Sequence, residues 1–529
     1  MNERTFRLLE YGEILKSLAR CALSDEAAAR ILEEQPLVDP AAVEKLKSQV
    51  SLIVDLMKKG DGESRERIPG IGNILPKLGV EGISLALDEA YALGIFVERG
   101  EALKSWLLKS VSLETGNFGE LLAAAPGCSS IAAAVFAVID REGKIRDLPA
   151  FRAIRRRIQR LQGELENTVA RYTGNEETRR MLQSGLPSQR DGRLVLAVKA
   201  NYRGRIRGIV HEVSATGQTV FVEPEEVVER NNDILIEQRA LDAEILRVLR
   251  EMTKGIAAQQ EELTQFHRII VELEILRAKA RYAVETKGVF ALAPVTGPEP
   301  AISLREARHP LLGAAAVPID LVSAPEIRTV IVTGPNTGGK TVALKTLGLF
   351  ALMNQSGLAL PAAEGTGFPV FDGIYADIGD EQSLSQSLST FSGHMINIAG
   401  IAAAAGEHSL VLLDELGSGT DPEEGSAIAM AILDHLIEKK AYLIVTTHHG
   451  ILKNYGYTRE GVENASMEFD SRTLSPTFRI LMGVPGESRA LDIARRNGLS
   501  PEIVEKAQSY LAEERADVSA LIRGLRDKH

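Results

Sequence analysis

The sequence contains little cysteine and no long apolar run. Cys21 and Cys128 are its two cysteines, and they have no metal-site spacing. We expect both to be buried apolar side chains in a reducing compartment. No uninterrupted apolar stretch approaches the roughly 18 residues that a membrane helix needs, and the first residues carry charges throughout, unlike a signal peptide. These absences predict a cytoplasmic protein.

The charge of the chain is unevenly distributed along its length. A net charge of −11 argues weakly against a nucleic-acid partner. The segment from Arg141 to Arg207, however, contains 17 Lys or Arg against 7 Asp or Glu. A basic block on an acidic protein is typical of a surface that binds a phosphate backbone. The alternative, a solvated helix face, stays open.

The 529 residues exceed one ordinary domain, so we expect two to four. Apolar spacing of three and four residues predicts a helical core domain over residues 1–145. We expect residues 146–284 to form lever arms. They contain a long helical stretch over 150–183 and a second long helix from Glu225 to Val284. Short β-branched segments near 187–228 predict a small β insertion between them. The alternative is an ordinary helical bundle with a hairpin.

The second half of the chain has a different pattern. Residues 285–300 are rich in Pro and Gly and predict a linker. Over residues 301–496, apolar strands alternate with helices, which predicts a mainly parallel sheet with helices on its faces. Residues 497–529 begin with a turn and a helix, with Ser500 as N-cap and Pro501 at the first helical position.

One glycine-rich segment follows a predicted strand and matches the phosphate-binding pattern G-x-x-x-x-G-K-[ST]. It consists of Gly334, Pro335, Asn336, Thr337, Gly338, Gly339, Lys340 and Thr341. Backbone N–H groups of such a loop point at phosphate oxygens. We expect Lys340 to neutralise the β- and γ-phosphates of ATP and the Thr341 hydroxyl to bind Mg²⁺. The segment therefore predicts an ATPase.

Polar residues end two further predicted strands. Asp414 and Glu415 follow an apolar strand, and we expect Asp414 to bind Mg²⁺ through water and Glu415 to deprotonate the attacking water. His448 ends another strand, in Thr446-Thr-His-His, and can sense the γ-phosphate. Ligands bind at the carboxyl ends of parallel strands, so these side chains are predicted to face one crevice.

Five motifs occur in one order in the second half of the chain. They are Thr333-Gly-Pro-Asn-Thr-Gly-Gly-Lys-Thr, Asp377-Ile-Gly-Asp-Glu-Gln-Ser-Leu, Ser389-Thr-Phe-Ser-Gly-His-Met, Leu413-Asp-Glu-Leu-Gly-Ser-Gly-Thr-Asp-Pro and Thr446-Thr-His. Together they resemble the MutS ATPase, an ABC-class engine. Further similar segments are Leu9-Glu-Tyr, Arg193-Leu-Val-Leu-Ala-Val-Lys, Gly208-Ile-Val-His-Glu-Val-Ser and Gly486-Glu-Ser-Arg-Ala-Leu-Asp-Ile-Ala-Arg. The resemblance is to the second bacterial MutS paralogue and covers nearly the whole chain.

The resemblance implies a homodimer with composite ATP sites. It implies that Ser389 completes the partner's site and that Asn336 and Asp421 lie near the γ-phosphate and the interface. His309, in Arg308-His-Pro, resembles the segment beside the adenine. The segment at 497–511 resembles the family's dimer contact. Arg489 follows Ser488 where the family usually has Asn, which leaves the role of residue 489 open.

Two parts of longer relatives are not found in the sequence. Mismatch-repair members carry an N-terminal domain with a Phe-x-Glu wedge, whereas Phe118-Gly-Glu120 lies here between Ala-rich helices and is interpreted as coincidence. Nothing resembles the Smr nuclease domain with its Leu-Asp-x-His-Gly-type motif. The chain is thus interpreted as a truncated or naturally short form, for which neither mismatch recognition nor endonuclease activity is expected.

The combined prediction is a multidomain protein: an all-α core with long helical lever arms carrying a small β clamp insertion, followed by an α/β P-loop NTPase of ABC/MutS type. The resemblance implies an ATP-driven clamp that acts on branched DNA, on collided ribosomes, or on both. Candidate nucleic-acid contacts are Arg155, Arg156, Arg157, Lys199, Arg203 and Arg205. Alternatives are a chromosome-maintenance ABC module, a mismatch-repair-like DNA binder and a transporter ATPase subunit.

Overall fold

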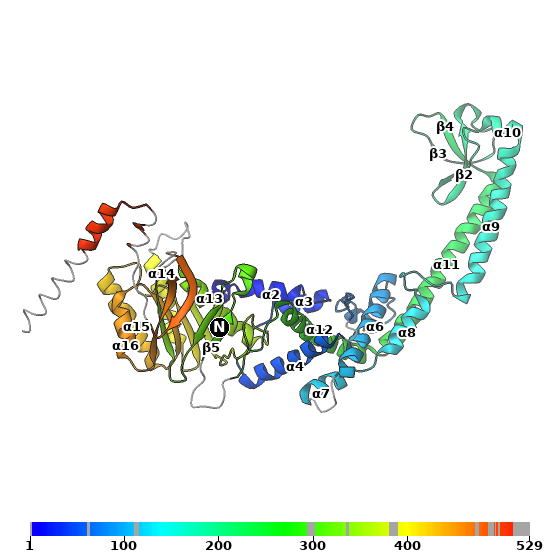
Figure 1. The fold of residues 1–529 in the computed structure, drawn as a ribbon. Coiled ribbons are helices and arrows are strands. Elements are labelled where there is room, and N and C mark those ends of the chain that lie inside the picture. Colours follow the sequence, from blue (N-terminus) through cyan, green and yellow to red (C-terminus); the bar gives the residue numbers. More distant parts are fainter. Residues whose placement is uncertain are drawn as a thin grey trace, which may run out of the picture. The chain divides into compact units, whose positions relative to one another are not determined.

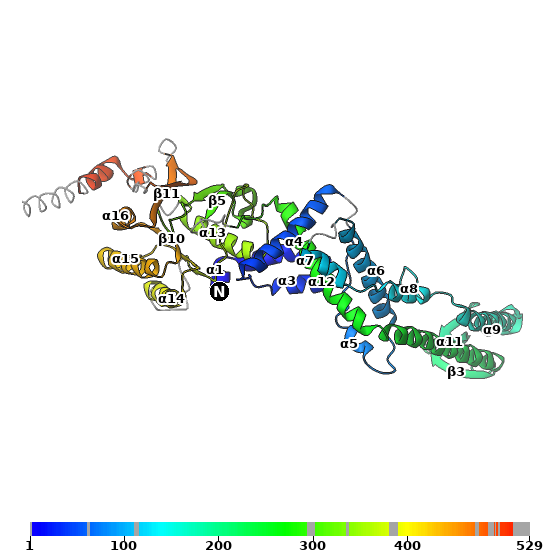
Figure 2. The same ribbon diagram turned by 90° about the horizontal axis from the view of Figure 1, so that it is seen from below.

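The computed structural model describes residues 3–60, 64–110, 116–293, 302–334, 338–379, 390–470, 475–484, 491, 494–495 and 498–510 (Figures 1 and 2). The chain forms two compact units. The sheet unit consists of Met1–Arg67, Trp106–Leu122 and Val271–His529, and the arm unit consists of Ile68–Ser105 and Ala123–Ile270. We describe each unit by itself, and the domain boundaries predicted above stay predictions.

A six-stranded sheet forms the centre of the sheet unit. Its order is β12-β11-β7-β10-β9-β8, and all neighbours run parallel except the antiparallel edge pair β11 and β12. The strands are β7 (Thr329–Thr333), β8 (Gly373–Asp377), β9 (Ser409–Leu413), β10 (Tyr442–Thr447), β11 (Val462–Asp470) and β12 (Ser475–Met482). The predicted mainly parallel sheet is therefore confirmed, and the three strands expected at β7, β9 and β10 are present.

Side chains along the central strands alternate between two buried faces. On β7, Val330 and Val332 join one apolar cluster with α13 (Lys340–Gln355). Ile331 joins a second cluster on the opposite face. That cluster contains residues of the helices α14 (Thr390–Ala404), α15 (Pro422–Glu438) and α16 (Gly450–Thr458). Helices thus cover both faces, as expected for strands that are apolar along their whole length.

Helices from the start of the chain belong to the core of the sheet unit. They are α1 (Glu3–Leu8), α2 (Tyr11–Ala19), α3 (Asp25–Leu32) and α4 (Pro40–Lys59). Leu9 is fully buried in the cluster that contains α13, and its side chain packs at Gly348, where a β-carbon would lie 2.8 Å from Leu9 Cδ2. The hydroxyls of Tyr11 and Ser356 are hydrogen-bonded at 2.6 Å. A small hairpin completes the unit, with β5 (Ser303–Ala307), η2 (Pro310–Ala315) and β6 (Ile319–Val322).

Two antiparallel helices dominate the arm unit: α9 (Pro149–Gly174) packs along α11 (Glu225–Ala257). Both are green to cyan in Figures 1 and 2. The four-stranded module between them consists of β1 (Ser188–Arg190), β2 (Arg193–Lys199), η1 (Ala200–Tyr202), β3 (Gly208–Val213) and β4 (Thr219–Pro224). Its order is β1-β2-β4-β3, with all pairs antiparallel. The three strands expected here are present, and β1 is an addition.

The remaining helices of the arm unit are short or shared with the sheet unit. They are α5 (Leu75–Leu78), α6 (Leu87–Ser110), α7 (Gly116–Ala124), α8 (Ser129–Val138), α10 (Glu176–Met181) and α12 (Gln260–Thr286). Within the described residues no single helix has the length and apolarity to cross a bilayer. Two consecutive helices, Phe118–Ala124 and Ser129–Val138, reach that length and apolarity only when they are taken together, and they are bent by 43° relative to each other.

The expectation of one uninterrupted helix from Glu225 to Val284 is wrong, because the chain breaks between α11 and α12. Side chains at the break are held by other parts of the arm unit: Gln259 Oε1 accepts from Ser130 Oγ at 2.9 Å, and Gln260 Nε2 donates to the Leu75 carbonyl at 3.1 Å. The helical stretch predicted over 150–183 is likewise divided into α9 and α10. Asn175 lies between the two helices and caps the start of α10, because its side chain accepts from the Glu177 N–H at 2.8 Å. Tertiary contacts and a local cap override the continuous helical pattern.

The structure describes only part of the predicted linker and part of the predicted C-terminal segment. Val289 and Leu292, within the predicted linker, form β-bridges to Leu360 and Gly367, and residues 294–301 lie outside the described part. The helix expected at Pro501 is confirmed, since residues 501–510 are helical. Residues 511–529 lie outside the described part.

The expectation that both cysteines are buried is confirmed for Cys128 and only in part for Cys21. Cys128 is buried and Cys21 half-buried, and both thiols are free. Burial raises the pKa of each to about 11, so the nucleophilic thiolate is disfavoured.

Candidate functional site at the carboxyl edge of the sheet

The glycine-rich loop begins where β7 ends and leads directly into α13. Gly339 has a φ of 90° as the residue before Lys340, and a β-carbon there would lie 2.9 Å from the Phe478 ring. Glycine satisfies both conditions, because it adopts positive φ without strain and has no side chain. Lys340 is the first residue of α13, so the positive end of this helix faces the loop. Pro335, Asn336 and Thr337 lie outside the described residues.

Lys340 is buried beside two carboxylates. Its Nζ donates to the Gly334 carbonyl at 2.9 Å, which folds the side chain back along the loop. Burial lowers the pKa of Lys340, and the charges of Glu415 and Asp414 oppose that effect. The structure therefore brings together three of the residues that the sequence predicted for ATP chemistry.

Asp414 accepts hydrogen bonds from two threonines on neighbouring elements. Thr341 Oγ1 donates to Asp414 Oδ2 at 2.6 Å, and Thr446 Oγ1, from β10, donates to Oδ1. This hydroxyl and this carboxylate are hard oxygen ligands of the kind that Mg²⁺ prefers, and they would hold the ion together with phosphates and water. Thr341 and Asp414 thus fit the predicted ion.

Glu415 has a strained backbone. Its φ of 49° lies in the left-handed region, which a residue with a long side chain rarely adopts. Hydrogen bonds on both sides hold this conformation: the Glu415 N–H donates to Thr446 Oγ1 at 2.8 Å, and the Leu416 N–H donates to the Thr446 carbonyl at 3.0 Å. Such strain is retained where a side chain must point in one direction.

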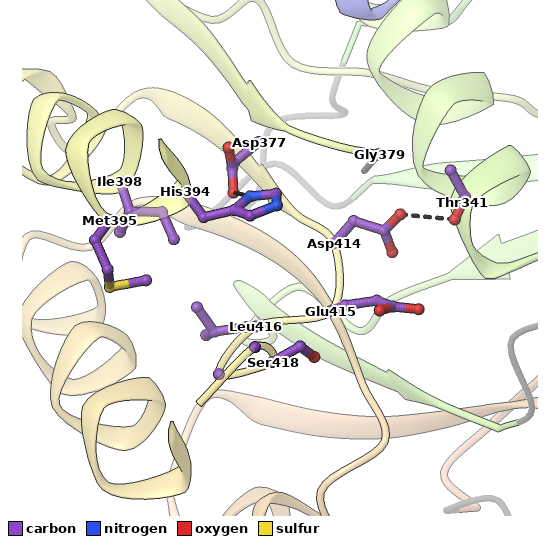
Figure 3. A pocket seen from close by; sticks show the side chains of 12 residues that line it. Thr341, Asp377, Gly379, His394, Met395, Ile398, Asp414, Glu415, Leu416 and Ser418 are labelled. Atoms are coloured by element: carbon purple, nitrogen blue, oxygen red, sulfur yellow. Dashed lines mark hydrogen bonds and ion pairs between the residues drawn. The ribbon is translucent and has the colours of Figure 1, made fainter. Parts of the chain in front are cut away.

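These side chains line a cavity of about 280 Å³ (Figure 3). Thr341, Asp414 and Glu415 form one side of it. The other lining residues are Asp377, Gly379, His394, Met395, Ile398, Leu416, Gly417, Ser418 and Gly419. The cavity opens at the carboxyl ends of β8 and β9, where parallel sheets with helices on both faces bind ligands.

His448 lies beside this group and outside the lining of the cavity. Its Nδ1 is 3.4 Å from Ser418 Oγ, and its ring stacks on His449 with centroids 4.4 Å apart. Burial lowers the pKa of His448, and the neighbouring His449 and Lys340 lower it further. The expectation that His448 faces the same crevice stays a prediction, because His448 is not among the residues that line the cavity.

Comparison with known proteins agrees with this geometry. Residues 330–514 match the family described as MutS domain V. The protein named Endonuclease MutS2 in Listeria monocytogenes serovar 1/2a (strain ATCC BAA-679 / EGD-e) is 38% identical over 533 residues, which cover 100% of this chain and 67% of that protein. The chain belongs to the MutS2 family.

Two other relatives give the same result. Proteins named Endonuclease MutS2 in Symbiobacterium thermophilum and Pelotomaculum thermopropionicum are each 38% identical to this chain, over 99% of its length and 66% of theirs. The chain therefore spans about two thirds of the length of these MutS2 relatives, and the name "endonuclease" describes those longer proteins.

Other residues predicted from the MutS resemblance lie apart from the cavity or outside the described part. His309 is buried as the N-cap of η2, where its Nδ1 accepts from the Leu311 N–H at 3.3 Å. Asp421 caps α15 by accepting from the Glu423 N–H at 3.0 Å and the Glu424 N–H at 3.3 Å. Ser389 and Arg489 lie outside the described residues. The roles proposed for His309, Asp421 and Ser389 stay predictions, and the role of Arg489 stays open.

Sequence reasoning gave no role to two polar side chains of the cavity. Asp377 ends β8, and His394 lies on α14; their side chains are hydrogen-bonded at 2.6 Å. Both occur in motifs quoted for the MutS resemblance. The missing signal was their pairing, because nothing local relates residues 17 positions apart.

The basic block of the arm unit is partly neutralised within the unit. Arg155 Nη1 lies 2.8 Å from Asp147, and Arg157 Nε lies 2.9 Å from Glu237 on α11. Lys199 Nζ donates to the Arg180 carbonyl at 3.1 Å. Arg156, Arg203 and Arg205 are exposed and have no ion pair with any residue that the structure describes. These three are the candidate contacts that remain available for phosphate groups.

Proposed function

We propose that this MutS2-family chain is an ATP-hydrolysing homodimeric clamp that acts on nucleic-acid structures. The observation that carries the proposal is the hydrogen-bonded series Thr341–Asp414–Thr446, with Glu415 directed into the same cavity. A phosphate loop, an oxygen donor pair for Mg²⁺ and a carboxylate base within one cavity are the components of nucleotide hydrolysis.

Each residue has a separate task in this proposal. The loop N–H groups and Lys340 hold the phosphates, and Thr341 with Asp414 holds Mg²⁺, which supplies charge neutralisation when bound. Glu415 orients the attacking water and takes its proton. His448, held neutral at pH 7 by its lowered pKa, donates or accepts a hydrogen bond at the γ-phosphate.

The dimer is proposed from the membership of the chain in the MutS2 family. The MutS resemblance assigns Ser389 and Asp421 to the site of a second copy. ATP binding between two copies would draw them together, and the arm helices would transmit that closure to the bound nucleic acid.

The partner is proposed to be branched or structured DNA, or a collided ribosome. Phosphate contacts carry no sequence information, so the exposed arginines of the arm unit suit any of these substrates. A competition assay with MgATP present compares homoduplex, mismatched and four-way-junction DNA with ribosome dimers. Tightest binding to junctions or to ribosome dimers selects between the two roles, and equal binding of homoduplex contradicts both.

The Glu415→Ala variant tests the ATPase. Loss of a general base typically lowers kcat by about 10²- to 10⁴-fold, while the loop and Lys340 continue to bind ATP. We therefore expect ATP binding at the wild-type affinity, almost no turnover, and a trapped dimer measurable by light scattering. Full turnover in this variant would overturn the assignment of Glu415 as the base.

The Arg156→Glu variant tests the arm. Each lost phosphate contact lowers the slope of log K against log salt by about one, so binding weakens and becomes less salt-dependent. Arg239→Glu is the matched control, an equal charge change at an exposed position of α11 outside the basic block. An unchanged slope for Arg156→Glu would move the binding surface elsewhere.

A further inference from the structure

A second buried carboxylate lies next to the proposed Mg²⁺ ligand and has no role in the function proposed above. Asp377 ends β8 and Asp414 directly follows the neighbouring parallel strand β9, and the Asp414 N–H donates to the Asp377 carbonyl at 2.8 Å. The Asp377 side chain is only 3% exposed and faces the same cavity as Thr341 and Glu415. A carboxylate so deeply buried must be compensated by hydrogen bonds.

Two side chains of α14 supply that compensation. His394 Nδ1 lies 2.6 Å from Asp377 Oδ2, and Asn397 Nδ2 donates to Oδ1 at 2.8 Å. Residues three apart lie on one face of a helix, so both bonds hold the same face of α14 against the end of β8. Arg4 of α1 adds a distant charge contact, with its Nη2 3.9 Å from Oδ1. Hydrogen bonds to an ionised acceptor are about twice as strong as neutral ones.

The helix held in this way forms one wall of the cavity. Met395 and Ile398 line it from α14, and in Figure 3 the His394 ring points from the helix toward the side lined by Asp414 and Thr341. A shift of α14 would therefore move this wall of the cavity.

We propose that Asp377 is a positioning residue for hydrolysis: through His394 and Asn397 it sets the place of α14 relative to the Mg²⁺ site. This inference rests on the proposed ATPase function. It predicts a loss in turnover that exceeds any loss in ATP binding, because the hydrogen bonds described for the Asp377 side chain go to α14. Misplacement of a catalytic group by about 1 Å costs on the order of 10²-fold in rate.

The test compares two substitutions of His394 in the full chain, with MgATP as substrate. His394→Ala removes the donor, and we expect kcat to fall by about 10- to 100-fold with KM within about threefold of wild type. His394→Asn places an amide N–H near the position of Nδ1, so it should retain most of kcat. If His394→Asn lowers kcat as much as His394→Ala does, the imidazole acts by something other than its hydrogen bond to Asp377, and the proposal is overturned.

The chain offers a matched control for the contact between strand and helix. Tyr375 Oη donates to the Ala404 carbonyl at 3.5 Å, which joins β8 to the far end of α14. Tyr375→Phe removes that bond and should leave kcat unchanged. An equal loss in Tyr375→Phe would show general destabilisation of the contact and contradict a positioning role.

Two further measurements keep the outcome decisive. Asp377→Ala combined with His394→Ala should be no slower than Asp377→Ala alone, since that variant already removes the bond to His394; a further loss in the double variant contradicts the proposal. Asn397→Ala, which leaves the imidazole in place, repeats the kcat test if thermal unfolding shows that His394→Ala does not fold. Absence of Glu415-dependent hydrolysis in the wild type would sink the ATPase proposal itself, whereas wild-type rates in the His394 and Asp377 variants would sink only this inference.

Discussion

His309 has a structural position as a helix cap and a proposed position beside the adenine of ATP. The sequence placed it beside the adenine by resemblance, and the structure gives it a buried position with Nδ1 as the N-cap of η2. Burial lowers its pKa, as does Lys345, while Glu10 acts in the opposite direction. A neutral imidazole is needed for this cap, because a protonated Nδ1 cannot accept a hydrogen bond.

The His309 cap predicts an acid-dependent loss of stability. The folded-state pKa lies below the unfolded value of about 6.5, so the stabilisation is complete above pH 6.5 and is lost as the pH falls toward the folded pKa. His309→Ala should cost about 1 kcal/mol at pH 7.5, the usual cost of a lost cap, and less at pH 5.5. Urea unfolding at both pH values measures the difference. An equal cost at both pH values contradicts the cap.

At the scale of elements, a buried charge cluster joins the β module of the arm to α11. Glu223 is fully buried at the end of β4. Its Oε1 accepts from Arg193 at 2.7 Å and from Asn231 at 2.8 Å, and its Oε2 lies 2.6 Å from His211 Nε2. Burial acts to raise its pKa, but hydrogen bonds from Asn231, His211 and Arg193 outweigh it and the pKa is lowered. The cluster fixes where β2, β3 and β4 meet the helix.

Glu223→Gln should loosen this junction. Removing one partner of a buried ion pair costs about 3–5 kcal/mol, because the remaining charges are left without compensation. Hydrogen exchange of β2 and β4 amides should accelerate in the variant. Glu212→Gln is the control, since its pair with Arg190 is exposed and contributes about 0–1 kcal/mol. In wild type the stabilisation from Glu223 should be lost as the pH falls below about 4.3, the unfolded value.

At the scale of the whole molecule, distant parts of the sequence share one core. The N-terminal helices α1 to α3 pack with α13, the helix that begins at the phosphate-loop lysine. Lys345 of α13 also pairs with Glu10 at 2.6 Å. The start of the chain is thus part of the unit that contains the proposed ATP site.

Leu9→Ala tests this shared core. Truncating a fully buried leucine typically costs about 2–5 kcal/mol, so the melting temperature of the sheet unit should fall even though Leu9 is remote in sequence from the ATP motifs. Binding of a non-hydrolysable ATP analogue should raise that melting temperature in both proteins. Leu32→Ala is the control, because Leu32 is 49% exposed. A wild-type melting temperature for Leu9→Ala would contradict the shared core.

The sequence by itself determined the parallel sheet, the strands that carry the site, and the grouping of Lys340, Thr341, Asp414 and Glu415. Alternating apolar segments and glycine spacing are local patterns, and parallel strands bring their carboxyl ends to one edge whatever the loops between them do. Only the tertiary structure decided the breaks at Asn175 and Ala258, the internal pairing of Arg155 and Arg157, and the contact of Asp377 with His394. Each of these features depends on contacts between side chains in the folded protein. The strength of such contacts cannot be predicted from any one segment of the sequence.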